Sequence, residues 1–182
     1  MTFTIIHNEQ TPAVPADAPR PSAQEITAFL AFFKKQETAA GLAANQCALD
    51  GVRWMHRMFA VRTNPELPFH LILHPVIDRT YGRSQVQQEG CLTWIGKSIY
   101  AQRYPTISVS HETRDREKIT GRIISGFEAQ IWQHEVNHLN GVIERFTFPH
   151  GQAVLKPQRN SQCACGSGKK YKQCCMLVFA EK

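Results

Sequence analysis

Apolar residues recur with a helical period near the start of the chain. Ser22 and Glu25 have the spacing of a capping box. The apolar residues that follow fall three and four positions apart, as on one helix face: Ile26, Phe29, Leu30 and Phe33. The pattern predicts a helix near residues 22–37.

A second helical pattern appears later and carries histidines as well as apolar residues. Ser125 and Glu128 again have capping-box spacing, and Asn140-Gly141 is typical of a helix end. Between them one stripe recurs at i, i+4, i+7 and i+11: Phe127, Ile131, His134 and His138. We expect this stripe to be buried.

The chain between these two helices has a β-rich texture. From about 53 to 124, short runs of branched and aromatic residues are separated by Asn, Pro, Gly and Asp: VRWMHRMFAV, HLILHPVI, SIYAQRYPTISVSH and KITGRII. Residues 1–21 contain four prolines and are expected to form an irregular lead-in. Helix, then strands, then helix predicts an α+β fold with mainly antiparallel sheets around the central histidine-bearing helix.

The composition excludes several classes of protein. The chain has 182 residues, of which 42% are hydrophobic, and this excludes a disordered chain. No apolar run is long enough to span a bilayer, and residues 1–10 do not resemble a signal peptide. We therefore expect a cytoplasmic protein without a membrane partner. In that reducing compartment the six cysteines are better suited to binding metal ions than to forming disulfides.

The positive charge is concentrated at the C-terminal end. Of the formal net charge of +6, five units lie between Gly151 and Lys182, where six Lys and Arg residues face one acid. Such a tail suits a polyanion such as RNA, whereas specific DNA binding is not expected. The alternative is a tail that only keeps the protein in solution.

The stretch QHEVNHLNG contains the spacing H-E-x-x-H. On a helix, His134 and His138 share one face and can bind one metal ion, with Glu135 beside them as a base. The alternative is two core histidines. A third ligand could be Glu144 downstream, in a pattern that resembles the metzincin proteases, or Cys91 upstream.

Three motifs taken together resemble the peptide deformylase family: GLAANQ, EGCLT and QHEVNHLNG. Cys91 lies 45 residues after Gln46, and His134 lies 43 residues after Cys91, which is the family's order and spacing. The resemblance implies a hydrolase that removes formate from N-formylmethionyl peptides or nascent chains. It implies Fe²⁺, replaceable by Ni²⁺, Co²⁺ or Zn²⁺, on Cys91, His134 and His138.

The resemblance also implies roles for other residues. Glu135 would move the proton, and Gln46 and the backbone N–H of Leu92 would hold the oxyanion. Substrate-binding positions would be Ala40, Gly41, Leu42, Glu89, Gly90, Gln130 and Ile131. Some residues depart from the family pattern: Ala39, Ala40, Thr93, Gln130 and Asn137. Ala40 and Gln130 would make the side-chain pocket wider and more polar than usual.

Four of the six cysteines cluster near the C-terminus. Cys163, Cys165, Cys174 and Cys175 surround a Gly-Ser-Gly turn, and their spacing resembles the SEC-C zinc motif. The resemblance implies one structural Zn²⁺ and docking to a partner such as the ribosome or a chaperone. We expect a deformylase-like domain at 1–147, a linker at 148–162 and the zinc motif at 163–182. The leftover Cys47 is expected to be a small buried thiol.

Two other functions fit parts of the sequence. One is a metzincin-like protease that uses Glu144 as the third ligand, although this leaves GLAANQ and Cys91 unexplained. The other is an inactive deformylase-like adaptor on the ribosome. The intact Glu135 argues against it, because a site without turnover has no physical need for a base.

Overall fold

The computed structural model describes residues 1–7, 9, 11–64, 66–142, 147–149, 159–160 and 170–173. The four tail cysteines and Glu144 lie outside these residues, so the structure does not test the predictions made for them. Among the described residues there is no helix long and apolar enough to cross a membrane.

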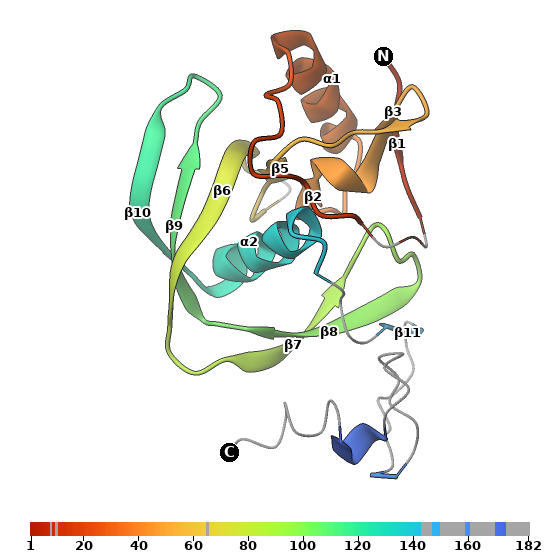
Figure 1. The fold of residues 1–182 in the computed structure, drawn as a ribbon, viewed down its shortest axis with the longest axis vertical. Coiled ribbons are helices and arrows are strands. Elements are labelled where there is room, and N and C mark those ends of the chain that lie inside the picture. Colours follow the sequence, from red (N-terminus) through yellow and green to blue (C-terminus); the bar gives the residue numbers. More distant parts are fainter. Residues whose placement is uncertain are drawn as a thin grey trace.

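The described chain forms three antiparallel sheets and two α-helices (Figure 1). A five-stranded sheet has the order β10-β9-β6-β5-β2, and its strands are β2 (Gly41–Ala43), β5 (Met58–Val61), β6 (His70–Tyr81), β9 (Thr106–Glu112) and β10 (Lys118–Ser125). A second sheet contains β7 (Gln85–Gly90), β8 (Lys97–Arg103) and β11 (Thr147–Pro149). A third contains β1 (Phe3–Ile5), β3 (Cys47–Leu49) and β4 (Val52–Arg53). The predicted α+β class is confirmed.

The two α-helices pack on opposite faces of the five-stranded sheet. Helix α2 (Gly126–Leu139) lies near the middle of the molecule, and α1 (Ala23–Lys34) lies beyond β2 and β5 (Figure 1). Strand β5 shows how the sequence produces this arrangement. Phe59 packs in the core with α2, whereas Met58 and Ala60 pack in the core with α1. Successive side chains of a strand point to opposite faces, so a continuous apolar run marks a strand covered on both sides.

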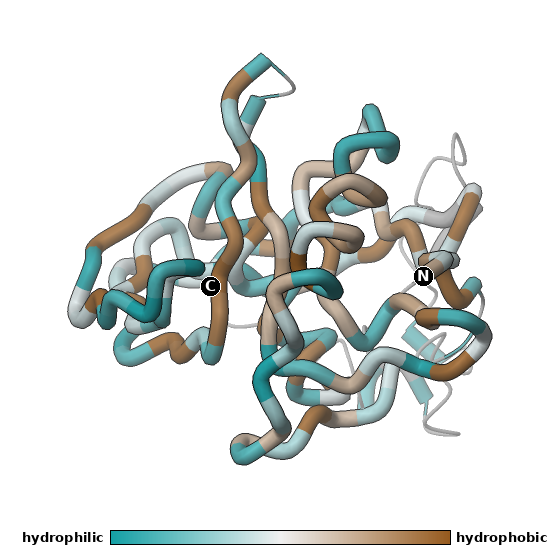
Figure 2. Tube along the Cα trace, turned by 90° about the horizontal axis from the view of Figure 1, so that it is seen from above, coloured by the Kyte–Doolittle hydropathy of each residue, from teal (hydrophilic) through white to brown (hydrophobic). Residues whose placement is uncertain are grey.

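Hydrophobic and hydrophilic stretches are interspersed along the described chain (Figure 2). Helix α1 begins as predicted, because the Ser22 hydroxyl accepts the Glu25 N–H at 3.2 Å and the Glu25 carboxylate accepts the Ser22 N–H at 2.7 Å. Phe29 and Phe33 are fully buried, which contributes roughly 1.5–3 kcal/mol each. The helix ends at Lys34, three residues before the predicted end.

Helix α2 differs from its prediction at the first turn. Ser125 is the N-cap residue, but its side chain makes no capping bond, and Glu128 pairs with Arg122 at 2.9 Å instead. The predicted stripe was wrong at Phe127, which is 54% exposed because it lies at a cavity rim and not in the core. The predicted end is confirmed, since Asn140 is the C-cap.

Three further segments correct the prediction. The lead-in contains β1, which pairs with β3. Strand β7 is polar (QVQQEG) and was missed because it has no apolar alternation. Phe148 and Pro149 lie in β11, which pairs with β8, so these two residues of the predicted linker form a strand, while the domain boundaries stay a prediction.

Candidate active site

Helix α2 presents both histidines of H-E-x-x-H on one buried face. His134 is 7% exposed and His138 is 4% exposed, and their Nε2 atoms are 3.1 Å apart. Cys91 directly follows β7, and its Sγ lies 3.3 Å from His138 Nε2. One donor atom from each of the three residues lies within 4.8 Å of the others.

These distances fit a single metal ion. Tetrahedral bonds of ordinary length to zinc separate two nitrogens by about 3.3 Å and a nitrogen from a sulfur by about 3.5 Å. The separations of 3.1 and 3.3 Å are close to both values. Three protein ligands leave one coordination position for water or substrate, as in catalytic sites. Among the described residues, Cys91, His134 and His138 therefore suit a metal, whereas the alternative ligand Glu144 lies outside these residues.

A buried ion pair orients His134. Arg103 donates from Nε and Nη2 to the two oxygens of Glu89, at 2.8 and 2.6 Å. Glu89 Oε2 lies 2.8 Å from His134 Nδ1. Burial raises the pKa of Glu89, but hydrogen bonds and charges from His134 and Arg103 outweigh it and lower the pKa to about 2. The carboxylate accepts the proton of Nδ1, so Nε2 keeps its lone pair for a metal.

His138 is held in its neutral form. Burial, together with electrostatic interactions with His134 and Arg103, holds the pKa of His138 well below its usual range. A neutral imidazole is the form that binds metals, so no proton must leave first.

The amide of Gln46 is fixed beside the thiol. Its Oε1 accepts the Ala43 N–H at 2.8 Å, and its Nε2 donates to Thr93 Oγ1 at 3.0 Å. The same Nε2 lies 3.6 Å from Cys91 Sγ. A donor held in place at this position can stabilise negative charge that develops on a substrate oxygen.

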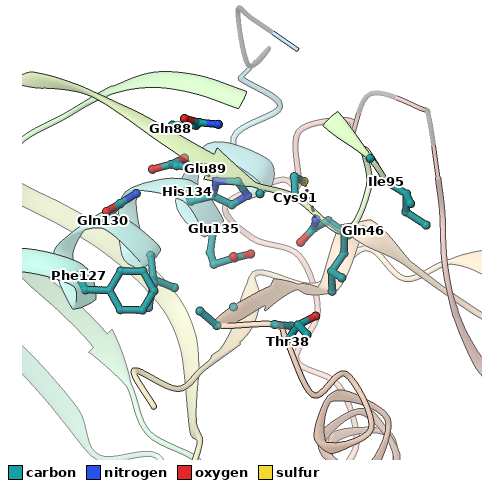
Figure 3. Close-up of a pocket in the computed structure, with 17 residues that line it drawn as sticks. Thr38, Gln46, Gln88, Glu89, Cys91, Ile95, Phe127, Gln130, His134 and Glu135 are labelled. Atoms are coloured by element: carbon teal, nitrogen blue, oxygen red, sulfur yellow. Dashed lines mark hydrogen bonds and ion pairs between the residues drawn. The ribbon is translucent and has the colours of Figure 1, made fainter. Parts of the chain in front are cut away.

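Strand β2 passes close to Glu135, and only a glycine fits at the point of contact. A Cβ on Gly41 would lie 2.3 Å from Glu135 Oε1 and 2.8 Å from Ile131 Cγ2. Glu135 is 3% exposed, and its carboxylate points into the space between Phe127 and Gln46 (Figure 3). The missing side chain of Gly41 therefore leaves the room that the carboxylate occupies.

A cavity of about 520 Å³ opens next to these groups. Phe127 and the 63% exposed Ile95 lie on opposite sides of it (Figure 3). A second cavity of about 260 Å³ shares Phe127 and Gln130 with the first. The larger cavity is lined by Thr38, Ala39, Ala40, Gly41, Gln46, Gln88, Glu89, Gly90, Cys91, Leu92, Ile95, Gly96, Phe127, Gln130, Ile131, His134 and Glu135.

Most of the predicted site residues that the structure describes line this cavity, but two of them do not. His138 is not part of the lining, although its Nε2 lies 3.1 Å from that of His134, which is. The side chain of Leu42 is fully buried in the core on the α1 side, so only its backbone could meet a substrate.

Cys47 is fully buried, and burial together with the charge of Glu135 raises the pKa of its thiol. Sequence reasoning missed Thr11, which contacts His138 and belongs to none of the three motifs.

Comparisons with known proteins agree with this geometry. The profile of the polypeptide deformylase family matches residues 5–147, and that of the SEC-C motif matches residues 159–177. Peptide deformylase 1 of Corynebacterium glutamicum is 34% identical over 106 residues, which cover 57% of this chain and 59% of the relative's length. Peptide deformylase 2 of Geobacillus stearothermophilus is 30% identical over 154 residues, covering 74% and 78%.

Solved structures show the same fold. A peptide deformylase from Synechococcus elongatus in complex with actinonin superposes with a TM-score of 0.64 at 21% identity, covering 78% of each chain. The enzyme of the Vibrio parahaemolyticus bacteriophage VP16T, also with actinonin, gives 0.62 at 26% identity and covers 76% of this chain and 97% of its own. The match over residues 5–147 and the assembled motifs place the chain in the peptide deformylase family.

Proposed function

We propose that this chain is a metal-dependent peptide deformylase, which hydrolyses the formamide bond of N-formylmethionyl peptides or nascent chains to formate and a free amine. The observation that carries the proposal is the convergence of Cys91 Sγ with the Nε2 atoms of His134 and His138 beside an open cavity. The reaction needs a water, a base and hydrogen-bond donors for the oxyanion. Residues of this chain are candidates for holding or supplying each of them.

Cys91, His134 and His138 would hold the ion. When bound, the metal supplies Lewis-acid chemistry, because it lowers the pKa of a water and polarises a carbonyl. A thiolate with two imidazoles suits Fe²⁺ and also Zn²⁺, Ni²⁺ or Co²⁺. We propose Fe²⁺ as the native ion on the family resemblance.

The chain's own residues supply the remaining chemistry. Glu135 takes a proton from the attacking water and later donates one to the leaving amine. Gln46 Nε2 and the backbone N–H of Leu92 donate to the oxygen of the tetrahedral intermediate, which is worth roughly 3 kcal/mol per donor in comparable sites. The buried pair of Glu89 and Arg103 holds His134 in the tautomer that leaves Nε2 for the metal.

The side-chain pocket supports a relaxed preference for methionine. Ala40 is small and Gln130 is polar, and Gln130 lies between the two adjoining cavities. A wall with less aliphatic surface stabilises a methionine side chain less, and room remains for other side chains.

For the tail we propose one Zn²⁺ bound by the four cysteines and docking to the ribosome or a chaperone. The SEC-C match over residues 159–177 and the local excess of positive charge support this. Docking near the exit of formylated chains would raise the local substrate concentration without new contacts at the active site.

Formate release tests the proposal. The full chain, purified without oxygen to protect Fe²⁺, should release formate from formyl-Met-Ala peptides. Glu135→Ala should abolish turnover and keep the metal, because Glu135 is a base and not a ligand. A metal-loaded parent chain that releases no formate would support the adaptor function instead. Loss of the metal in Glu135→Ala would show that the role assigned to Glu135 is wrong.

A further inference from the structure

The N-terminal segment, residues 11–14, crosses the C-terminal end of α2. The Val14 N–H donates to the Leu139 carbonyl at 2.8 Å. A Cβ on Gly141 would lie 2.7 Å from the Ala13 nitrogen, which shows how closely the two backbones approach. Arg57 donates to the Val14 carbonyl at 3.0 Å and to Asn140 Oδ1 at 3.1 Å. The segment is therefore tied to the helix that carries both ligand histidines.

Thr11 is the part of this segment that reaches a metal ligand. It is 2% exposed, and its hydroxyl oxygen lies 3.2 Å from His138 Nδ1. The hydroxyl donates its proton to the His138 carbonyl at 3.3 Å. Because its proton is used there, the oxygen is left to accept the proton of Nδ1. That places the lone pair of His138 on Nε2, the atom that faces Cys91 Sγ and His134 Nε2.

Asn45 supports the same arrangement with two hydrogen bonds. Its Nδ2 donates to the His138 carbonyl at 2.6 Å and to the Pro12 carbonyl at 2.9 Å. One amide thus joins the end of α2 to the residue that follows Thr11. The position of the hydroxyl is fixed by its neighbours and does not depend on its own bonds alone.

We propose that Thr11 is a positioning residue of the metal site, which sets the tautomer and ring orientation of His138. It does for His138 what Glu89 does for His134, with a neutral hydroxyl in place of an ion-paired carboxylate. Acceptors on the second nitrogen of a ligand histidine raise metal affinity by orienting the ring and fixing the proton. This inference rests on the proposed metal site, and its test measures metal binding apart from formate release.

The test compares two substitutions in the full chain. Thr11→Val keeps the shape and removes the hydroxyl, whereas Thr11→Ser keeps the hydroxyl. Ni²⁺ affinity is measured by competition with a chelator, and a His138→Ala chain gives the background from all other sites. Thr11→Val should weaken Ni²⁺ binding by about 10–100-fold, while Thr11→Ser should stay within about threefold of the parent. Equal affinity in Thr11→Val and the parent would overturn the proposal.

A matched control separates the hydroxyl from the packing of the segment. Arg57→Met removes the bonds to Val14 and Asn140 without touching His138. It should lower the melting temperature and leave Ni²⁺ affinity unchanged. If it weakens Ni²⁺ binding as much as Thr11→Val does, general loosening is the cause and the proposal fails.

A second measurement needs no change at Thr11. In a ¹⁵N spectrum of the Zn²⁺-loaded parent, with the signal assigned by comparison with His138→Ala, His138 should carry its proton on Nδ1 and exchange it slowly. An Nδ1 without a proton would overturn the proposal even if Thr11→Val does not fold. Because neither readout uses a formylated peptide, failure here is distinguishable from failure of the deformylase activity.

Discussion

Substituting Gly41 with alanine places a methyl group where the carboxylate of Glu135 lies. The added Cβ would be 2.3 Å from Glu135 Oε1, 2.8 Å from Glu135 Cδ and 2.8 Å from Ile131 Cγ2. Contact distances this short do not occur between real Cβ atoms and their neighbours. The flexible part of the contact is the glutamate, so Glu135 must turn away from the position that it holds beside the metal site.

The size of the effect follows from the distance. Relieving the contact with Oε1 requires a shift of about 1 Å, and a shift of this size in a reacting group can cost about 100-fold in rate. That corresponds to about 2.7 kcal/mol of activation free energy. Overpacking against Ile131 should also lower the free energy of unfolding by about 1–3 kcal/mol. The metal ligands are untouched, so metal content should not change.

The assay measures kcat for formate release, metal per chain and urea unfolding for Gly41→Ala. Gly90→Ala is the matched stability control, because a Cβ at Gly90 meets no atom within 4 Å. In a Glu135→Ala background the same Gly41 substitution should destabilise less, since the contact with the carboxylate is gone. Unchanged kcat with full metal content would refute the placement of Glu135 against Gly41.

Three further predictions follow from other parts of the chain. In the metal-free protein Glu89 has a folded pKa of about 2 against an ordinary 4.5. The ionised Glu89 therefore contributes at most about 3 kcal/mol to the free energy of unfolding, fully present above about pH 4.5 and lost as the pH falls towards 2. The difference in unfolding free energy between the parent and Glu89→Gln should shrink over that range. A difference that stays constant would contradict this prediction. The substitutions Ala40→Ile and Gln130→Ile introduce aliphatic side chains. They should raise kcat/KM for formyl-Met peptides relative to kcat/KM for formyl-Gln peptides by about tenfold or more. A parent chain that already strongly prefers formyl-Met peptides would show that other residues close the pocket. Metal analysis should find roughly two ions per full chain and one in a chain ending at Gln162. The shorter chain should keep its activity on short peptides but lose its salt-sensitive co-sedimentation with ribosomes. Loss of activity on short peptides would place the tail within the catalytic fold.

The structural features that could be predicted from the sequence are those that depend on residues within one short segment. The capping box at Ser22 and the stop at Asn140 depend on bonds within a few residues, and both are found. The apolar run around Phe59 could be recognised as a strand because its neighbours are apolar on both faces. The three motifs predicted a common site, and the structure brings Gln46, Cys91 and His134 to one cavity.

The features that the sequence could not predict depend on partners far along the chain. Ser125 has capping-box spacing, yet Glu128 pairs with Arg122 from β10, and this competing ion pair is invisible in the local pattern. Strand β7 is polar and mostly exposed, and its one buried residue, Glu89, is paired with Arg103, so periodicity did not reveal it. Thr11 lies 127 residues from His138, in a proline-rich stretch without a motif. No signal in that stretch could have pointed to the metal site.

The most direct test of the central claim compares Cys91→Ala with Glu144→Ala in the formate-release assay, with metal content measured on the same samples. The Cys-His-His deformylase site predicts that the parent and Glu144→Ala release formate from formyl-Met-Ala, and that Cys91→Ala loses or weakens the catalytic metal and with it the activity. Full activity in Cys91→Ala together with an inactive Glu144→Ala would contradict the ligand set on which the proposed mechanism depends.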